Sequence, residues 1–128
     1  MIKPYKTVIV DDHPIVSEGL QVLFSQSKEV EIIRSFKTGA ALLEYGGLGK
    51  VDVILLDVFL PDSNGIDLCL KIKKSHPKII ILAMSSQSER SIVLQMIKNG
   101  ANGYLLKSAS LDEFKNCIHK GVEGELAF

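Results

Sequence analysis

Short runs of consecutive apolar residues alternate along the chain with longer segments whose apolar residues recur every three or four positions. The first pattern is typical of strands and the second of amphipathic helices. The predicted strands are residues 7–10, 30–33, 51–56, 79–84 and 103–106. The predicted helices are residues 14 to about 27, 38–45, 66–75 and 88–99, and a last helix that opens at residue 110. Strict alternation of strand and helix indicates a doubly wound α/β fold.

The third and fourth runs also predict how the strands are arranged. They are apolar at consecutive positions, as in parallel strands that helices cover on both faces. Turn and cap residues separate the elements. Pro14 suits a first helical turn, Gly100 suits a helix end, and Ser110 with Glu113 forms a capping-box pattern.

Composition and charge favour one soluble domain. The chain has 128 residues, of which 46% are hydrophobic, enough for a single core without disulfides or metals. Lys plus Arg equals Asp plus Glu at 15 each, so direct binding to nucleic acid or to an anionic membrane is not expected. No apolar stretch reaches membrane length, and no signal peptide precedes the first strand, so we expect a cytoplasmic protein.

The two cysteines, Cys69 and Cys117, lie in apolar helical segments without metal-ligand spacing. We expect buried free thiols, which fits a reducing cytosol. A disulfide between them is the alternative.

The candidate chemistry lies where the apolar runs end. In open parallel sheets, ligands bind beyond the carboxyl ends of the strands. The polar residues at those ends are Asp11, Asp12, Asp57, Ser85, Ser86 and Lys107. Gathered carboxylates repel one another, and Mg²⁺, which prefers oxygen ligands, removes that repulsion. A carboxylate beside Mg²⁺ can accept a phosphoryl group, whose oxygens a hydroxyl and an ammonium can bind.

Three stretches resemble the receiver domains of two-component response regulators, and together they extend over essentially the whole chain. They are Val-Ile-Val-Asp-Asp-His-Pro at 8–14, Leu-Leu-Asp-Val-Phe-Leu-Pro-Asp-Ser-Asn-Gly at 55–65 and Gly-Ala-Asn-Gly-Tyr-Leu-Leu-Lys at 100–107. The first and last are most similar to the NarL/FixJ (LuxR-type) subfamily. The resemblance implies a flavodoxin-like (βα)5 fold with a five-stranded parallel sheet in strand order 2-1-3-4-5. It also implies one receiver domain over residues 1–128, and a C-terminal helix-turn-helix domain that is absent from this chain.

The resemblance also assigns roles to the acidic residues. Asp57 is expected to be the phosphoacceptor. Asp12 is expected to bind Mg²⁺ or Mn²⁺ together with Asp57, while Asp11 acts nearby or through water. The backbone carbonyl of Phe59 is implied as a further metal ligand.

The remaining implied roles concern the last two strands. Lys107 is expected to pair with the acceptor and then with the phosphate, and Ser85 to hydrogen-bond the phosphate. Ser86 could present its hydroxyl instead, but the family's usual spacing from the lysine favours Ser85. Tyr104 is expected to change rotamer with Ser85 as the switch. Many receivers have proline after the lysine, whereas this chain departs from that pattern with Ser108.

Other polar residues receive structural interpretations. His13, His76 and His119 do not cluster in the sequence, and His13 is expected to help the first helix start rather than bind metal. The lysines of residues 71–78 are expected to form a solvated face.

The function implied is a signalling domain, not an enzyme, that assists its own phosphorylation and dephosphorylation. A histidine kinase would phosphorylate it, and phosphorylation would promote self-association and transcription control, with DNA contacted only through the absent domain. Three alternatives stay open: a haloacid-dehalogenase-like phosphatase, a flavodoxin-like nucleotide-binding module, and a pseudo-receiver that binds partners without phosphorylation.

Overall fold

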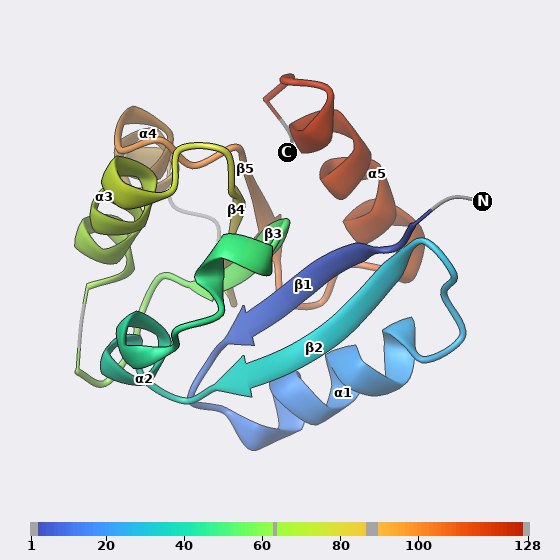
Figure 1. The fold of residues 1–128 in the computed structure, drawn as a ribbon. Helices are drawn as coiled ribbons and strands as arrows, with labels where there is room; N and C mark the ends of the chain where they lie inside the picture. The colour runs from blue at the N-terminus through green and yellow to red at the C-terminus, as the bar shows by residue number, and fades with distance from the viewer. Residues whose placement is uncertain (1–2, 63, 87–89, 127–128) are drawn as a thin grey trace.

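The fold is a single parallel sheet between two layers of helices (Figure 1). A computed structural model describes residues 3–62, 64–86 and 90–126. The strands are β1 (Tyr5–Val10), β2 (Val30–Phe36), β3 (Val53–Asp57), β4 (Ile80–Ser85) and β5 (Gly103–Leu106). The helices are α1 (Pro14–Phe24), α2 (Gly39–Glu44), α3 (Gly65–Ser75), α4 (Arg90–Lys98) and α5 (Leu111–Val122), with a short 3-10 helix η1 (Leu48–Lys50). The strand order is β2-β1-β3-β4-β5, which confirms the predicted flavodoxin-like topology.

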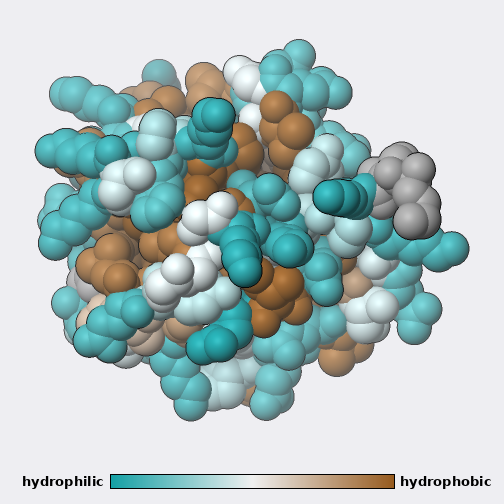
Figure 2. Space-filling model, in the orientation of Figure 1, coloured by the Kyte–Doolittle hydropathy of each residue, from teal (hydrophilic) through white to brown (hydrophobic). Residues whose placement is uncertain are grey.

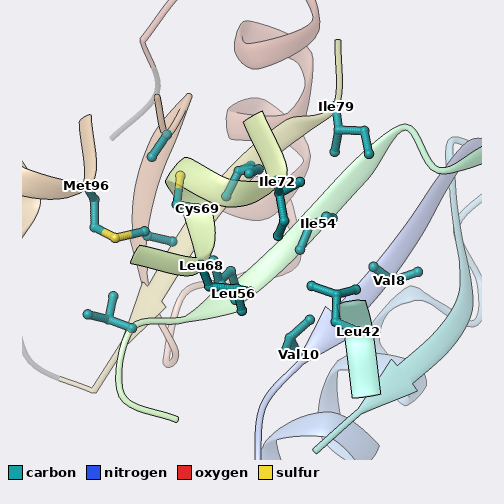
Figure 3. Packing of buried hydrophobic residues seen from close by; sticks show 14 of the residues in the cluster. Val8, Val10, Leu42, Ile54, Leu56, Leu68, Cys69, Ile72, Ile79 and Met96 are labelled. Carbon is teal, nitrogen blue, oxygen red and sulfur yellow. The ribbon is translucent and has the colours of Figure 1, made fainter. Parts of the chain in front are cut away.

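Two apolar clusters lie on opposite faces of the sheet. On one face, residues of β1 and β3 such as Val8 and Ile54 pack against Leu42 of α2, Ile72 of α3 and Met96 of α4 (Figure 3). On the other face, the sheet packs against α1 and α5. Hydrophilic side chains cover most of the surface in the view of Figure 2. The central strands are therefore buried on both sides, as their unbroken apolar runs predict.

Several element boundaries differ from the sequence prediction. β2 continues to Phe36, three residues further than expected. Among the strands that the structure describes it pairs with β1 alone, so its outer side tolerates polar residues such as Arg34 and Ser35 that break the apolar pattern. β3 begins at Val53, two residues later than expected, because Val51 caps η1 by donating its amide to the Leu48 carbonyl at 3.1 Å. The predicted start of α4 at Ser88 lies outside the described residues.

The predicted helix ends are confirmed where the structure describes them. Ser110 accepts a hydrogen bond from the Glu113 amide at 3.2 Å, and the Glu113 carboxylate accepts one from the Ser110 amide at 3.1 Å, which completes the capping box of α5. Gly100 has a φ of 102°, the left-handed conformation that commonly ends a helix, directly after α4.

Cys69 and Cys117 are free and buried. They belong to the two different core clusters, on α3 and α5, so the sheet separates them and the disulfide alternative is wrong. In the described part of the chain, no helix has both the length and the apolarity that crossing a bilayer requires.

Candidate functional site

The polar strand ends meet at one edge of the sheet. Because β1, β3 and β5 are parallel, their carboxyl ends lie on the same side, and Asp57 is the last residue of β3. Asp11 follows β1 directly and Lys107 follows β5 directly. The Lys107 amide donates to the Ser85 carbonyl at 2.8 Å, which holds the end of β5 against the end of β4. The predicted convergence of acids and lysine is thus present.

An ion-paired core forms the centre of the site. Lys107 Nζ lies 2.8 Å from Asp11 Oδ2 and 3.1 Å from Asp57 Oδ2. The Phe59 amide donates to Asp57 Oδ1 at 3.0 Å. Asp11 and Asp57 are each only 1% exposed, and this lysine brings a positive charge to both buried carboxylates.

The acids also form a cluster that could hold a cation. One ligand atom from each of Asp11, Asp12, His13 and Asp57 can be chosen so that all four lie within 4.8 Å of one another. Asp12 Oδ1 is buried and has no hydrogen-bond partner within the described residues. A buried carboxylate oxygen without a donor fits a hard divalent cation, which binds through oxygen.

Burial and charge perturb both central groups. Burial raises the pKa of Asp57, and the Asp11 charge adds to this effect, while the Phe59 amide and Lys107 act against it. Burial alone would lower the pKa of Lys107, but its hydrogen bonds to Asp11 and Asp57 outweigh burial and raise it. The site therefore keeps its ammonium charged and holds the Asp57 carboxylate in an environment that favours a further positive charge.

Ser85 lies on β4 and Tyr104 on β5. Ser85 is the buried last residue of β4, whereas Ser86 is exposed, which favours Ser85 as the inward hydroxyl. Tyr104 pairs in register with Ala83, and its ring is buried in the cluster on the α2, α3 and α4 side of the sheet. The Phe59 side chain is 60% exposed.

The peptide bond between Lys107 and Ser108 is trans. This loop therefore has the usual trans peptide bond where many receivers have a proline, and it still places Lys107 beside the acids.

His13 is the N-cap residue of α1, in agreement with its predicted role at the helix start, and its ring also lies beside the site acids, a contact that the sequence interpretation did not include. Its Nδ1 lies 2.9 Å from Asp11 Oδ1 and 3.3 Å from Asp12 Oδ1. The ring thus contacts the acids rather than serving only the helix start. Its position directly after two site acids was the available signal.

Asp62 holds the loop after β3 in place, which the sequence interpretation also missed. Its two carboxylate oxygens accept hydrogen bonds from the Gly39 and Ala40 amides, each at 3.0 Å, at the start of α2. The Gly65 amide closes the same loop by donating to the Val58 carbonyl at 2.9 Å. The loop that carries Phe59 is therefore fixed at both ends.

A family model described as the response regulator receiver domain matches residues 7–119. The chain belongs to this family. The match favours the receiver interpretation over the phosphatase and nucleotide-binding alternatives.

Curated relatives of the receiver are transcription regulators and response regulators. The Fimbriae Z protein of Salmonella typhimurium is 30% identical over 123 residues, which are 96% of this chain and 59% of that protein. The transcriptional regulatory protein LnrK of Bacillus subtilis is 32% identical over 113 residues, 88% of this chain and 51% of that protein. The receiver thus spans between half and two thirds of the length of these relatives.

Solved structures agree with the receiver fold. The signal receiver domain of NarL from Mycobacterium tuberculosis superposes with a TM-score of 0.87 at 29% identity, and covers 96% of this chain and 99% of that one. A response regulator of the LuxR family from Aurantimonas has the same TM-score at 25% identity, over 98% of this chain and 89% of that one. The relatives thus include regulators of the predicted NarL and LuxR type.

Proposed function

We propose that this receiver accepts a phosphoryl group on Asp57 and passes the signal on through a change in its surface. The observation that carries the proposal is the buried Asp57 carboxylate held 3.1 Å from Lys107, beside Asp11 and Asp12. Phosphoacceptor signalling is the activity of the receiver family. Asp57 is the acid at the centre of the cluster and therefore the acceptor we assign.

The phosphoryl transfer uses groups that are already in position. A carboxylate oxygen of Asp57 bonds to phosphorus while the bond from phosphorus to the donor's imidazole nitrogen breaks, and the electron pair leaves with that nitrogen. The product is an aspartyl phosphate. Lys107 then pairs with the phosphoryl oxygens instead of the free carboxylate, and Ser85 donates a hydrogen bond to them.

The acidic cluster fits Mg²⁺ or Mn²⁺ as the cofactor. Asp12, Asp57 and the Phe59 carbonyl are the ligands we assign, with Asp11 nearby or bound through water. Asp12 Oδ1, which has no hydrogen-bond partner within the described residues, supports this assignment. When bound, the ion would neutralise the carboxylates and the incoming phosphoryl oxygens.

Phosphorylation would then bias the packing of the last two strands. The added charge draws Ser85 toward the phosphate, and Tyr104 occupies the space beside it. The Tyr104 ring is already buried, so this change of rotamer does not require an exposed ring to be moved out of water. Moving a two-state equilibrium from mostly inactive to mostly active takes about 5 kcal/mol of preference for the active state.

The greater length of the relatives supports a proposal about the partners of this receiver. Because the chain covers 59% of the Fimbriae Z protein, we propose that residues 1–128 are the receiver of a longer regulator with a LuxR-type DNA-binding domain. Its phosphodonor would be a histidine kinase, and phosphorylation would promote self-association. A cytosolic location fits this partner and the two free cysteines.

Labelling by acetyl phosphate in the presence of Mg²⁺, followed by intact mass, tests the proposal. The parent chain is expected to gain one phosphoryl group, and Asp57→Asn none, while Asp112→Asn on the exposed start of α5 behaves as the parent. A parent chain that is never labelled would indicate a pseudo-receiver. A second arm titrates Mg²⁺ into Asp12→Ala, whose affinity is expected to fall; undiminished affinity contradicts the metal assignment.

A further inference from the structure

The His13 ring lies among the acids of the proposed cation site. Its Nδ1 is 2.9 Å from Asp11 Oδ1, 3.3 Å from Asp12 Oδ1 and 3.8 Å from Asp57 Oδ2. The His13 amide also donates to Asp11 Oδ1 at 2.8 Å, which fixes the residue against the cluster. One nitrogen thus faces one carboxylate oxygen from each of three acids, and the Lys107 ammonium lies 3.3 Å from the same nitrogen.

The 2.9 Å contact is a hydrogen bond in the metal-free chain, and all three distances are also short enough for ligands that share one metal ion. Bonds from a transition metal to nitrogen or oxygen are about 2.1 Å long, so two ligands of one ion are at most about 4.2 Å apart. All three nitrogen–oxygen distances at His13 fall below that limit. A single ion could therefore contact the imidazole together with carboxylates, with small movements of a ring that is 59% exposed.

The charge of the site matches a divalent cation. Asp11, Asp12 and Asp57 supply three formal negative charges and Lys107 one positive charge, which leaves two negative charges. Mg²⁺ would satisfy this charge through oxygen atoms alone. Imidazole nitrogen, in contrast, suits zinc, copper, nickel and cobalt, which bind nitrogen and carboxylate ligands together.

We propose that His13 makes this site a binding site for divalent transition metals of the imidazole-preferring class, with Nδ1 as a ligand beside the carboxylates. The metal replaces the contact between Nδ1 and Asp11, and the ring carries its proton on Nε2. Such an ion uses the same acids that Mg²⁺ uses, so it competes with Mg²⁺. The inference rests on the cation site of the proposed function but not on phosphoryl transfer.

Metal titration of the tag-free chain tests the assignment. Co²⁺ binding is followed by visible absorption, Cu²⁺ binding by electron paramagnetic resonance with nitrogen-14 spin-echo modulation, and Mg²⁺ binding by calorimetry. The variants are His13→Asn and, as the matched control, His119→Asn. His119 is also a partly exposed histidine beside a carboxylate, but it pairs with Glu29 away from the site.

The expected result separates the two classes of metal. His13→Asn is expected to bind Co²⁺ at least about tenfold more weakly and to lose the imidazole nitrogen signal of Cu²⁺. Its Mg²⁺ affinity is expected to stay within about twofold of the parent value, because Mg²⁺ does not need the nitrogen. His119→Asn is expected to match the parent in all three titrations.

Two outcomes would overturn the inference in distinguishable ways. Unchanged Co²⁺ affinity and a persisting nitrogen signal in His13→Asn, with normal Mg²⁺ binding, would refute the role of His13 alone. Absence of both Mg²⁺ and Co²⁺ binding in the parent chain would refute the cation site of the proposed function as well.

Discussion

Lys107 Nζ lies 3.1 Å from Asp57 Oδ2, although 50 residues separate the two side chains in the sequence. The same ammonium lies 2.8 Å from Asp11 Oδ2. One cation therefore compensates two buried acids that come from different strands. Removing it would leave both carboxylates buried without that compensation, at a large cost in stability.

Lys107→Met is accordingly expected to lower the free energy of unfolding at pH 7 by about 3 kcal/mol in the absence of divalent metal. Urea denaturation with EDTA measures the change. Lys78→Met, which removes an exposed lysine, serves as the control and is expected to change stability by less than about 0.5 kcal/mol. Equal stability of the two variants would show that the ion pairs at the strand ends contribute nothing.

Asp57→Asn is expected to stabilise the metal-free chain at neutral pH. Burial raises the pKa of Asp57 above its ordinary value of 3.8, so folding favours the neutral carboxyl. The stability from this group is present at low pH and is lost as the pH rises through the raised pKa. Asparagine does not ionise, so the melting temperature of the variant should exceed that of the parent more at pH 8 than at pH 4. A difference in melting temperature that shrinks with rising pH would contradict the raised pKa of Asp57.

Gly65→Ala is expected to disturb the loop between β3 and α3. A Cβ at residue 65 would lie 2.7 Å from the Val58 Cα and 2.8 Å from the Asp57 carbonyl oxygen, both of which are backbone atoms. The backbone must shift, at a cost of about 1–3 kcal/mol. Urea denaturation of Gly65→Ala and of Gly19→Ala measures this cost. A Cβ at Gly19 would meet nothing within 4 Å, so that variant should not be destabilised.

Asp62→Ala is expected to loosen α2. The substitution leaves the Gly39 and Ala40 amides without their carboxylate acceptor, at a cost of about 1 kcal/mol. Hydrogen exchange of these two amides is expected to quicken, while exchange within α5 stays unchanged. Exchange at the parent rate would show that the two hydrogen bonds do not hold the helix.

Cys69 and Cys117 are expected to react with a thiol reagent only after unfolding. Burial raises the pKa of Cys69 to about 11 and also raises that of Cys117, so the thiolate form is scarce in the folded chain. Ellman's reagent measures the reaction with and without denaturant. Rapid reaction of either thiol in the native chain would contradict the burial of these residues.

The fold could be predicted because its main determinant is the burial of both faces of the central strands. This burial appears in the sequence as unbroken apolar runs. The sequence also placed Asp57 and Lys107 at one edge because parallel strands end on one side of a sheet. The true end of β2 at Phe36 escaped prediction because polar residues are tolerated on an edge strand. Contacts such as those of Asp62 depend on side-chain geometry across more than twenty residues, which periodicity does not report.

The central claim is that Asp57 is the residue that carries the phosphoryl group. Borohydride reduction of the chain after acetyl phosphate treatment with Mg²⁺ converts an aspartyl phosphate into homoserine, and peptide mass spectrometry then locates it. Homoserine is expected at position 57 and at no other aspartate. Homoserine at Asp11 or Asp12 with position 57 unmodified would contradict the account.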